Sequence, residues 1–197
     1  MKNRRIIILS GVPGVGKSTL LKKIKEARPN LLFSRSCTDR PPRPEEDSNA
    51  YEYISSSEFE AGIRDDIFLE YVYEGGIHYG TRKSTLENLA DGARILMDLD
   101  TQGGLSILHA YPDDTLLIFI YAPKEVVANR LRSREEGRMP PEVINNRLAR
   151  WDAENIRAVQ YHYIVENTEL DICLEQLLSI IDNNHEYENI HSNKHPW

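Results

Sequence analysis

The sequence predicts an α/β fold in which a parallel sheet is flanked by helices. Short apolar runs of strand length alternate with amphipathic segments along most of the chain, which is typical of βαβ units. A glycine-rich turn joins the first apolar run to the first amphipathic segment. The stretch 36–81 breaks the alternation, because it contains Pro-Pro-Arg-Pro and two β-like runs around one helical segment. We therefore expect a small lobe inserted into the sheet.

The expected elements alternate from the N-terminus onward. The core strands are expected at Arg5–Leu9, Leu31–Ser34, Ile95–Leu99, Leu116–Tyr121 and Tyr163–Val165. The core helices are expected at Ser18–Ala27, Lys83–Asp91, Lys124–Arg132, Pro141–Tyr161 and Asp171–Asp182. In the lobe, β-like runs at Tyr51–Ile54 and Phe68–Tyr73 surround a helix at Ser57–Arg64. These elements predict one domain over 1–183, with core 1–35 and 82–183, lobe 36–81 and a polar, frayed tail at 184–197.

Composition excludes several classes of protein. The 197 residues hold 24 Lys and Arg against 31 Asp and Glu, and the resulting charge of −7 argues against nucleic acids or an anionic membrane as partners. No apolar run approaches the ~18 residues of a membrane span. Two cysteines, Cys37 and Cys173, cannot form a disulfide framework or a four-thiolate metal site. We expect a cytoplasmic protein, either a monomer or a homodimer.

A glycine-rich loop is the strongest functional signal. The stretch from Gly11 to Ser18 has the Walker A spacing G-x-x-x-x-G-K-[ST] and lies between an expected strand and an expected helix. Its backbone amides and the helix N-terminus suit phosphate oxygens, Lys17 would reach the β- and γ-phosphates, and the Ser18 hydroxyl would bind Mg²⁺. The alternative is a turn that binds nothing. The residues expected to bind ATP are Gly11, Val12, Pro13, Gly14, Val15, Gly16, Lys17, Ser18 and Thr19.

The Walker A loop predicts that the core is of P-loop NTPase type. A core of this type needs an acidic side chain beside the metal ion. Asp98 and Asp100 end an apolar run and would share one strand face, with Asp100 as the second metal ligand. Asp100 also begins a D-x-x-G motif typical of small GTPases. That class needs Asn-Lys-x-Asp to recognise guanine, and here the Asn193-Lys194 pair is followed by His-Pro. The GTPase interpretation is therefore disfavoured.

A second anion site is predicted in the lobe. Arg40 and Arg43 lie on a proline-stiffened segment, where two guanidinium groups can face one phosphate at little entropic cost. Tyr51 and Tyr79 follow, and their hydroxyl groups can donate to phosphate oxygens. The alternative is a solvated loop with surface charges.

With these segments in place, the sequence resembles the guanylate kinase family from Arg5 to about Ile181. The loop is similar to the family's Gly-Pro-Ser-Gly-Val-Gly-Lys-Ser-Thr, and Ser36-Cys-Thr-Asp-Arg-Pro-Pro-Arg-Pro is similar to its Ser-x-Thr-Thr-Arg-x-Pro-Arg. The segments that follow in the family's order are Tyr51-Glu-Tyr-Ile-Ser, Phe68-Leu-Glu-Tyr, His78-Tyr-Gly-Thr, Asp98-Leu-Asp-Thr-Gln-Gly and Val165-Glu-Asn-Thr-Glu-Leu-Asp. An ordered set of this kind is more specific than a Walker loop alone.

The resemblance implies a site for GMP. The residues it assigns to the GMP phosphate are Arg40, Arg43, Tyr51 and Tyr79, and those it assigns to guanine are Ser36, Glu70, Thr81 and Asp98 or Asp100. Hydrogen-bond chemistry agrees, because a carboxylate at Glu70 can accept from guanine N1–H and N2–H₂, whereas adenine N1 would leave that carboxylate unpaired. One departure from the family pattern is Asp39, which is able to pair with Arg40 and weaken its hold on phosphate.

The segment from Arg130 to Arg150 is basic. It holds six Arg and three Glu, a net charge of 6 − 3 = +3. The resemblance implies an arginine-rich lid at about 133–146, with Arg134 and Arg147 as catalytic residues and Arg138 as a rival to Arg134. The alternative to a lid is a solvated basic helix with no role in catalysis. The sequence thus predicts Mg²⁺-dependent transfer of a phosphoryl group from ATP to GMP or dGMP; the other hypotheses are a kinase of another monophosphate and a non-catalytic binding module of the same family.

Overall fold

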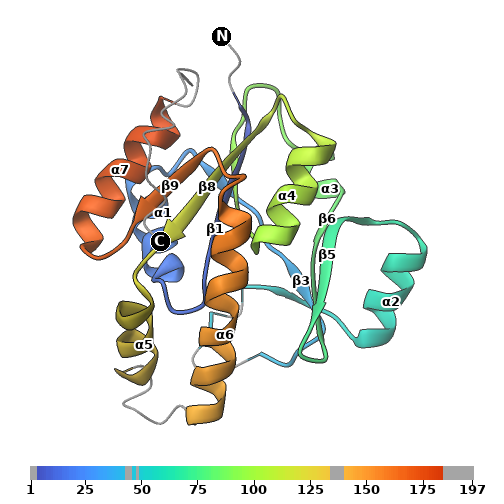
Figure 1. Cartoon of the computed structure of the whole chain (residues 1–197). Helices are drawn as coiled ribbons and strands as arrows, with labels where there is room; N and C mark the ends of the chain where they lie inside the picture. Colours follow the sequence, from blue (N-terminus) through green and yellow to red (C-terminus); the bar gives the residue numbers. More distant parts are fainter. Residues whose placement is uncertain (1–3, 43–45, 48, 134–139, 184–197) are drawn as a thin grey trace.

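The computed structural model describes residues 4–42, 46–47, 49–133 and 140–183, and these residues form two sheets with helices around them (Figure 1). The larger sheet has five strands in the order β2-β7-β1-β8-β9, and every neighbouring pair is parallel. Its strands are β1 (Ile6–Gly11), β2 (Leu32–Phe33), β7 (Ile95–Asp98), β8 (Thr115–Tyr121) and β9 (Tyr163–Glu166). The predicted α/β fold with a parallel sheet is confirmed.

Helices cover the five-stranded sheet in two groups. Helices α1 (Lys17–Ala27) and α7 (Leu170–Asp182) contact each other and strands β1 and β9, respectively, whereas α4 (Thr101–Ala110) contacts β1, β8 and α6 (Pro141–Ala158). The remaining core helices are α3 (Ser84–Glu87) and α5 (Lys124–Ser133). Every residue of β1 and β8 is buried. This burial explains why both strands are continuous apolar runs in the sequence rather than alternating ones.

The segment between β2 and α3 folds into a second sheet at one side of the molecule (Figure 1). Its four strands have the order β4-β3-β6-β5 and are partly antiparallel, and α2 packs beside them. These elements are β3 (Cys37–Thr38), β4 (Glu52–Tyr53), α2 (Ser56–Arg64), β5 (Phe68–Glu74) and β6 (Ile77–Arg82). A small core of its own, built on Cys37, Phe59 and Phe68, stabilises this sheet. Strand β5 contacts α4, so the second sheet lies against the core.

The helices of the core differ in two places from those that the sequence predicts. The helix expected over Lys83–Asp91 is only the short α3, which buries none of its side chains and is followed by a turn at Gly92 with φ 75°. Conversely, helix α4 was not among the predicted elements. Its Gly103 and Gly104 are both needed for close packing: a Cβ atom built on Gly104 would lie 2.4 Å from the Tyr161 hydroxyl oxygen.

Of the helices that the structure describes, none combines the length and the apolar character that a membrane crossing requires.

Candidate active site

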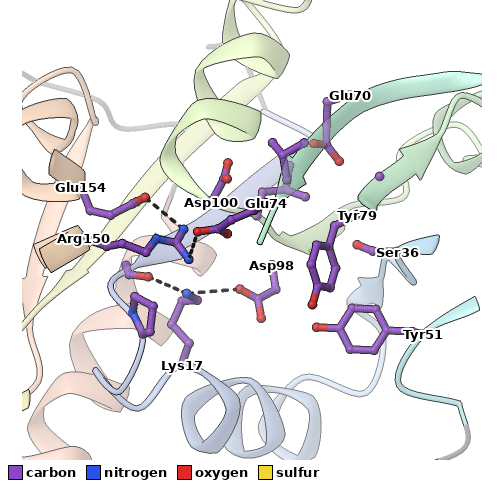
Figure 2. Close-up of a pocket in the computed structure, with 15 residues that line it drawn as sticks. Lys17, Ser36, Tyr51, Glu70, Glu74, Tyr79, Asp98, Asp100, Arg150 and Glu154 are labelled. Atoms are coloured by element: carbon purple, nitrogen blue, oxygen red, sulfur yellow. Dashed lines mark hydrogen bonds and ion pairs between the residues drawn. The ribbon is translucent and has the colours of Figure 1, made fainter. Parts of the chain in front are cut away.

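A cavity of about 200 Å³ opens where the two sheets meet, at the carboxyl ends of β1 and β7 (Figure 2). The lining residues that the sequence predicted for the site are Gly11, Pro13, Lys17, Ser36, Tyr51, Glu70, Tyr79, Asp98 and Asp100. The lining residues that it did not predict include Val72, Glu74, Gly80, Leu99, Arg150 and Glu154. The cavity therefore joins the phosphate loop to the lobe.

The phosphate loop turns sharply between β1 and α1. Gly14 has φ 90° and Gly16, the N-cap of α1, has φ 104°, a region that residues with a Cβ rarely adopt. The Val15 carbonyl oxygen accepts hydrogen bonds from Asn167 Nδ2 at 2.7 Å and Arg130 Nη1 at 3.0 Å. These bonds engage a carbonyl that would otherwise repel an anion. The sequence analysis assigned no role to Arg130 or Asn167, although Asn167 lies within one of the quoted motifs.

Lys17 lies at the mouth of the loop, facing the end of β7. Its Nζ donates to the Gly11 carbonyl oxygen at 2.6 Å and lies 3.7 Å from Asp98 Oδ1 (Figure 2). Burial raises the pKa of Asp98, and the charge of Lys17 opposes that rise. Ser18 and Thr19 are exposed in the first turn of α1. The other predicted ATP-binding residues, Val12, Gly14, Val15 and Gly16, belong to the loop but do not line the cavity.

Asp98 and Asp100 differ in position, contrary to the prediction that they share a strand face. Strand β7 ends at Asp98, and Asp100 lies beyond it as the N-cap of α4. The Oδ1 atom of Asp100 accepts a hydrogen bond from Gly103 N at 2.7 Å. The prediction was wrong because the alternation of side chains stops where the strand stops. Both carboxylates nevertheless line the cavity.

A buried carboxylate lies on the lobe side of the cavity. Glu70 is only 9% exposed, and the hydroxyl group of Thr81, which is fully buried, donates to its Oε1 at 2.7 Å. Burial raises the pKa of Glu70 to about 7, Asp100 adds to the rise and the Thr81 hydrogen bond opposes it. Glu70 and Ser36 line the same cavity, whereas Thr81 lies behind Glu70 and is not part of the lining. The predicted carboxylate and hydroxyl are thus brought together.

Arg40 is held by a carboxylate that the sequence analysis did not single out. Its Nη1 and Nη2 donate to the two oxygens of Glu46 at 2.7 and 2.6 Å, and its guanidinium lies 4.8 Å from the ring centroid of Tyr51. This pairing raises the pKa of Arg40 above its ordinary value. The hypothesis that Asp39 pairs with Arg40 was wrong: Asp39 accepts from the backbone N of His78 at 2.7 Å, and its Oδ2 lies 2.7 Å from His78 Nδ1.

The remaining predicted phosphate contacts are only partly described. The rings of Tyr51 and Tyr79 approach edge to face with centroids 6.0 Å apart, and both line the cavity. Arg40 lies behind Tyr51 and is not part of the lining. Arg43 lies outside the described residues.

The arginine-rich segment places an unpredicted residue in the cavity. Arg134 and Arg138 lie outside the described residues, and Arg147 is on α6 but does not line the cavity. Arg150, one turn further along α6, does line it. The sequence shows Arg150 only as one basic residue of the segment, and the packing of α6 is what brings it to the cavity.

The oxygen donors near the loop suit a hard divalent cation. They are the Ser18 hydroxyl and the carboxylates of Asp98 and Asp100, and Mg²⁺ prefers such ligands. Within 4–42, 46–47, 49–133 and 140–183, no group of three or more His, Cys, Asp or Glu side chains could hold a metal ion.

Comparisons with known proteins agree with this geometry. A sequence model of the family described as guanylate kinase matches residues 3–184. A guanylate kinase of Gloeobacter violaceus is 42% identical over 174 residues, which cover 87% of this chain and 83% of that protein. One from Fusobacterium nucleatum is 37% identical over 180 residues, covering 90% of this chain and 96% of that protein.

Solved structures show the same fold. The crystal structure of a guanylate kinase from Anaplasma phagocytophilum superposes with a TM-score of 0.74 at 21% identity, covering 95% of this chain and 89% of that one. A gluconokinase from Sinorhizobium meliloti has a TM-score of 0.52 at 17% identity, covering 94% and 98%. The family match, together with relatives above 30% identity over most of their length, shows that this chain belongs to the guanylate kinase family.

Proposed function

We propose that the chain transfers the γ-phosphoryl group of ATP to GMP or dGMP, giving ADP and, respectively, GDP or dGDP, with Mg²⁺ as cofactor. The observation that carries this proposal is one cavity with the phosphate loop and Lys17 at one end and the buried pair of Glu70 and Thr81 at the other. One end suits a triphosphate, and the other suits a base that presents hydrogen-bond donors. Membership of the family supports the same reaction.

The donor side would hold ATP through main-chain amides. Residues Gly11 to Thr19 would surround the phosphates, and Lys17 would exchange its bond to the Gly11 carbonyl oxygen for phosphate oxygens. Ser18 and Asp100 would hold Mg²⁺, which when bound neutralises charge on the β- and γ-phosphates. Asp98, whose Oδ1 lies 3.7 Å from Lys17 Nζ, would orient that lysine.

The acceptor side would bind guanine through Glu70, Thr81, Ser36 and the two aspartates. An ionised Glu70 accepts from N1–H and N2–H₂ of guanine, whereas adenine would leave a buried carboxylate against a lone pair, at a cost of ~1–3 kcal/mol or more. Gln in place of Glu70 would keep the bond with Thr81 but could not accept both hydrogens. Selectivity for guanine is therefore assigned to Glu70.

The GMP phosphate would be bound by Tyr51, Tyr79, Arg40 and Arg43. Arg40 is 7% exposed, and its Nε has no hydrogen-bond partner among the described residues. Glu46 engages only the two terminal nitrogens, so Nε–H would be left for an anion once Tyr51, behind which Arg40 lies, moves aside. An unpaired buried donor costs ~1–3 kcal/mol, which a phosphate oxygen would recover. Glu46 thus would orient Arg40 rather than compete with the substrate.

The chemical step would need positioning and positive charge rather than a protein nucleophile. Phosphoryl transfer passes through a loose transition state with charge spread over the equatorial oxygens. Lys17, Arg134 and Arg147 would stabilise that charge. The attacking oxygen belongs to the GMP phosphate, which is already ionised, so no strong general base is required. Approach of lobe 36–81 to the core would exclude water and limit hydrolysis of ATP.

The test is a coupled assay of ADP release with Mg²⁺-ATP and GMP, dGMP, AMP, UMP or CMP. Turnover with GMP or dGMP, and a far lower kcat/KM with the other monophosphates, is expected. Turnover with AMP or UMP in the absence of turnover with GMP would refute the assignment of the base. Chelation of the metal should abolish turnover, and its restoration by added Mg²⁺ would support the cofactor.

A further inference from the structure

Arg150 connects the two halves of the cavity. Its Nη1 lies 2.6 Å from Glu74 Oε1 at the end of β5, and its Nη2 lies 3.5 Å from Glu154 Oε1, one turn further along α6. Figure 2 shows the guanidinium of Arg150 pointing into the cavity between these carboxylates, on the same side as Lys17. One end of the pair with Glu74 therefore belongs to the lobe and the other to the core.

The ion pair between Arg150 and Glu74 is placed where it can restrain movement of the lobe. Glu74 is the last residue of β5, immediately before the turn at Gly75-Gly76, whereas the chain leaves the lobe at the far end of the same hairpin, after Arg82. A contact at the free end of a hairpin limits its swing more than a contact beside its attachment does. On the core side Arg150 is fixed by Glu154, which is 4% exposed and also accepts from Thr101 N at 3.3 Å.

The arrangement held by this pair is the one in which the monophosphate pocket exists. With β5 against α4, Glu70 faces the N-terminus of α4, since a Cβ atom on Gly103 would lie 2.8 Å from Glu70 Oε2. Asp98 and Asp100 then line the same cavity as Glu70 and Tyr79. A contact that favours this arrangement raises the fraction of molecules able to bind GMP, and the apparent dissociation constant falls in proportion.

We propose that Arg150 is a positioning residue, which through its ion pair with Glu74 holds the lobe against the core and so sets the affinity for the monophosphate. The proposal rests on the proposed function. The role proposed for Arg150 differs from that of the arginines that would touch the transferring phosphoryl group, because the partner of Arg150 is on the lobe. Arg150 and Glu74 act as a unit, so either variant alone removes the whole effect.

The experiment is a double-variant cycle with Glu74→Gln, Arg150→Gln and the double variant. Steady-state kcat and KM are measured for GMP and for ATP, and the GMP dissociation constant is measured by calorimetry without ATP. The side chains of Arg150 and Glu74 are 33% and 44% exposed, so the coupling should be modest, roughly three- to fivefold. Each single variant should raise the GMP KM and dissociation constant by that factor, and the double variant should be no worse than either single one.

The matched control is Asp152→Asn. Asp152 is on the same helix and pairs with Lys124 at 2.8 Å, but both residues belong to the core. This control should leave every parameter within twofold of the wild-type value. Melting temperatures accompany each variant, and Glu74→Gln, which changes an exposed side chain on the lobe, tests the proposal even if Arg150→Gln fails to fold.

The outcomes separate this proposal from the proposed function. An unchanged GMP dissociation constant in Glu74→Gln overturns the positioning role, as do effects of the two variants that multiply. A fall in kcat for Arg150→Gln without a change in GMP affinity also overturns it, and would assign Arg150 to the chemical step. Failure of the wild-type protein to phosphorylate GMP overturns the proposed function instead.

Discussion

The phosphate loop and the lobe prepare for an anion in different ways. In the loop, the conformation is fixed by the backbone at Gly14 and Gly16 and from outside by donors to the Val15 carbonyl oxygen. In the lobe, the groups proposed to recognise the nucleotide are side chains that already hold partners, Arg40 with Glu46 and Glu70 with Thr81. A main-chain site recognises phosphate as such, whereas a site of paired side chains distinguishes one nucleotide from another. The variants below should therefore separate rate from selectivity.

The largest effect is expected on the loop side. Lys17→Ala removes the side-chain charge nearest the loop, and kcat should fall by at least ~10²–10³, the usual cost of losing one preorganised electrostatic group. The GMP dissociation constant, measured by calorimetry, should stay within about twofold, because Lys17 belongs to the donor side. A variant that kept the full rate would contradict the proposed mechanism.

On the lobe side, Glu70→Gln should separate recognition from stability. GMP KM should rise by roughly 10²-fold, and discrimination against AMP should shrink, because an amide cannot accept both guanine hydrogens. The folded protein should gain stability above pH 7, since the wild-type fold must then carry an ionised carboxylate whose pKa burial has raised to about 7. Below about pH 4.5 both side chains are neutral, and this gain should vanish. Melting temperatures at pH 4 and pH 8 measure the difference.

The pH dependence of GMP binding is a second test of the role of Glu70 on the lobe side. As the pH falls through about 7, Glu70 takes up a proton and loses acceptor capacity, so GMP KM should rise by up to about tenfold per pH unit. A phosphate monoester titrates near pH 6 as well. Glu70→Gln is the matched control, because it retains the phosphate titration alone. If GMP KM of the wild-type protein changed with pH in the same way as that of the variant, the titration of Glu70 would not be the cause of the pH dependence.

The smallest effect is expected at Glu46. Glu46→Gln keeps the shape of the side chain but weakens the pair that orients Arg40, and charge-assisted bonds of this kind are about twice as strong as neutral ones. GMP KM should rise about three- to tenfold with kcat and the ATP KM unchanged. A lower GMP KM would mean that Glu46 competes with the phosphate, and would reverse the role given to it here.

Local sequence patterns account for the fold better than for the contacts within the site. Buried strands such as Thr115–Tyr121 appear as apolar runs, and the Walker spacing locates the turn after β1. Pairings between distant segments leave no such pattern. Asp39 and Arg40 are adjacent in sequence, but they follow the end of β3 and have different partners: Asp39 accepts from His78, and Arg40 donates to Glu46. The pair of Arg150 and Glu74 joins residues 76 positions apart, and only the packing of α6 against the lobe brings them together.

The two neighbouring glycines at the start of α4 restrict the substitutions that this sequence can accept during evolution. Added bulk at Gly103 would press on Glu70, and added bulk at Gly104 would press on the Tyr161 hydroxyl, which donates to Ser10 at 2.7 Å. One added methyl group would thus disturb the proposed base-binding carboxylate at the first position, and the contact between β1 and Tyr161 at the second. Selection for catalysis and selection for folding act here on consecutive codons.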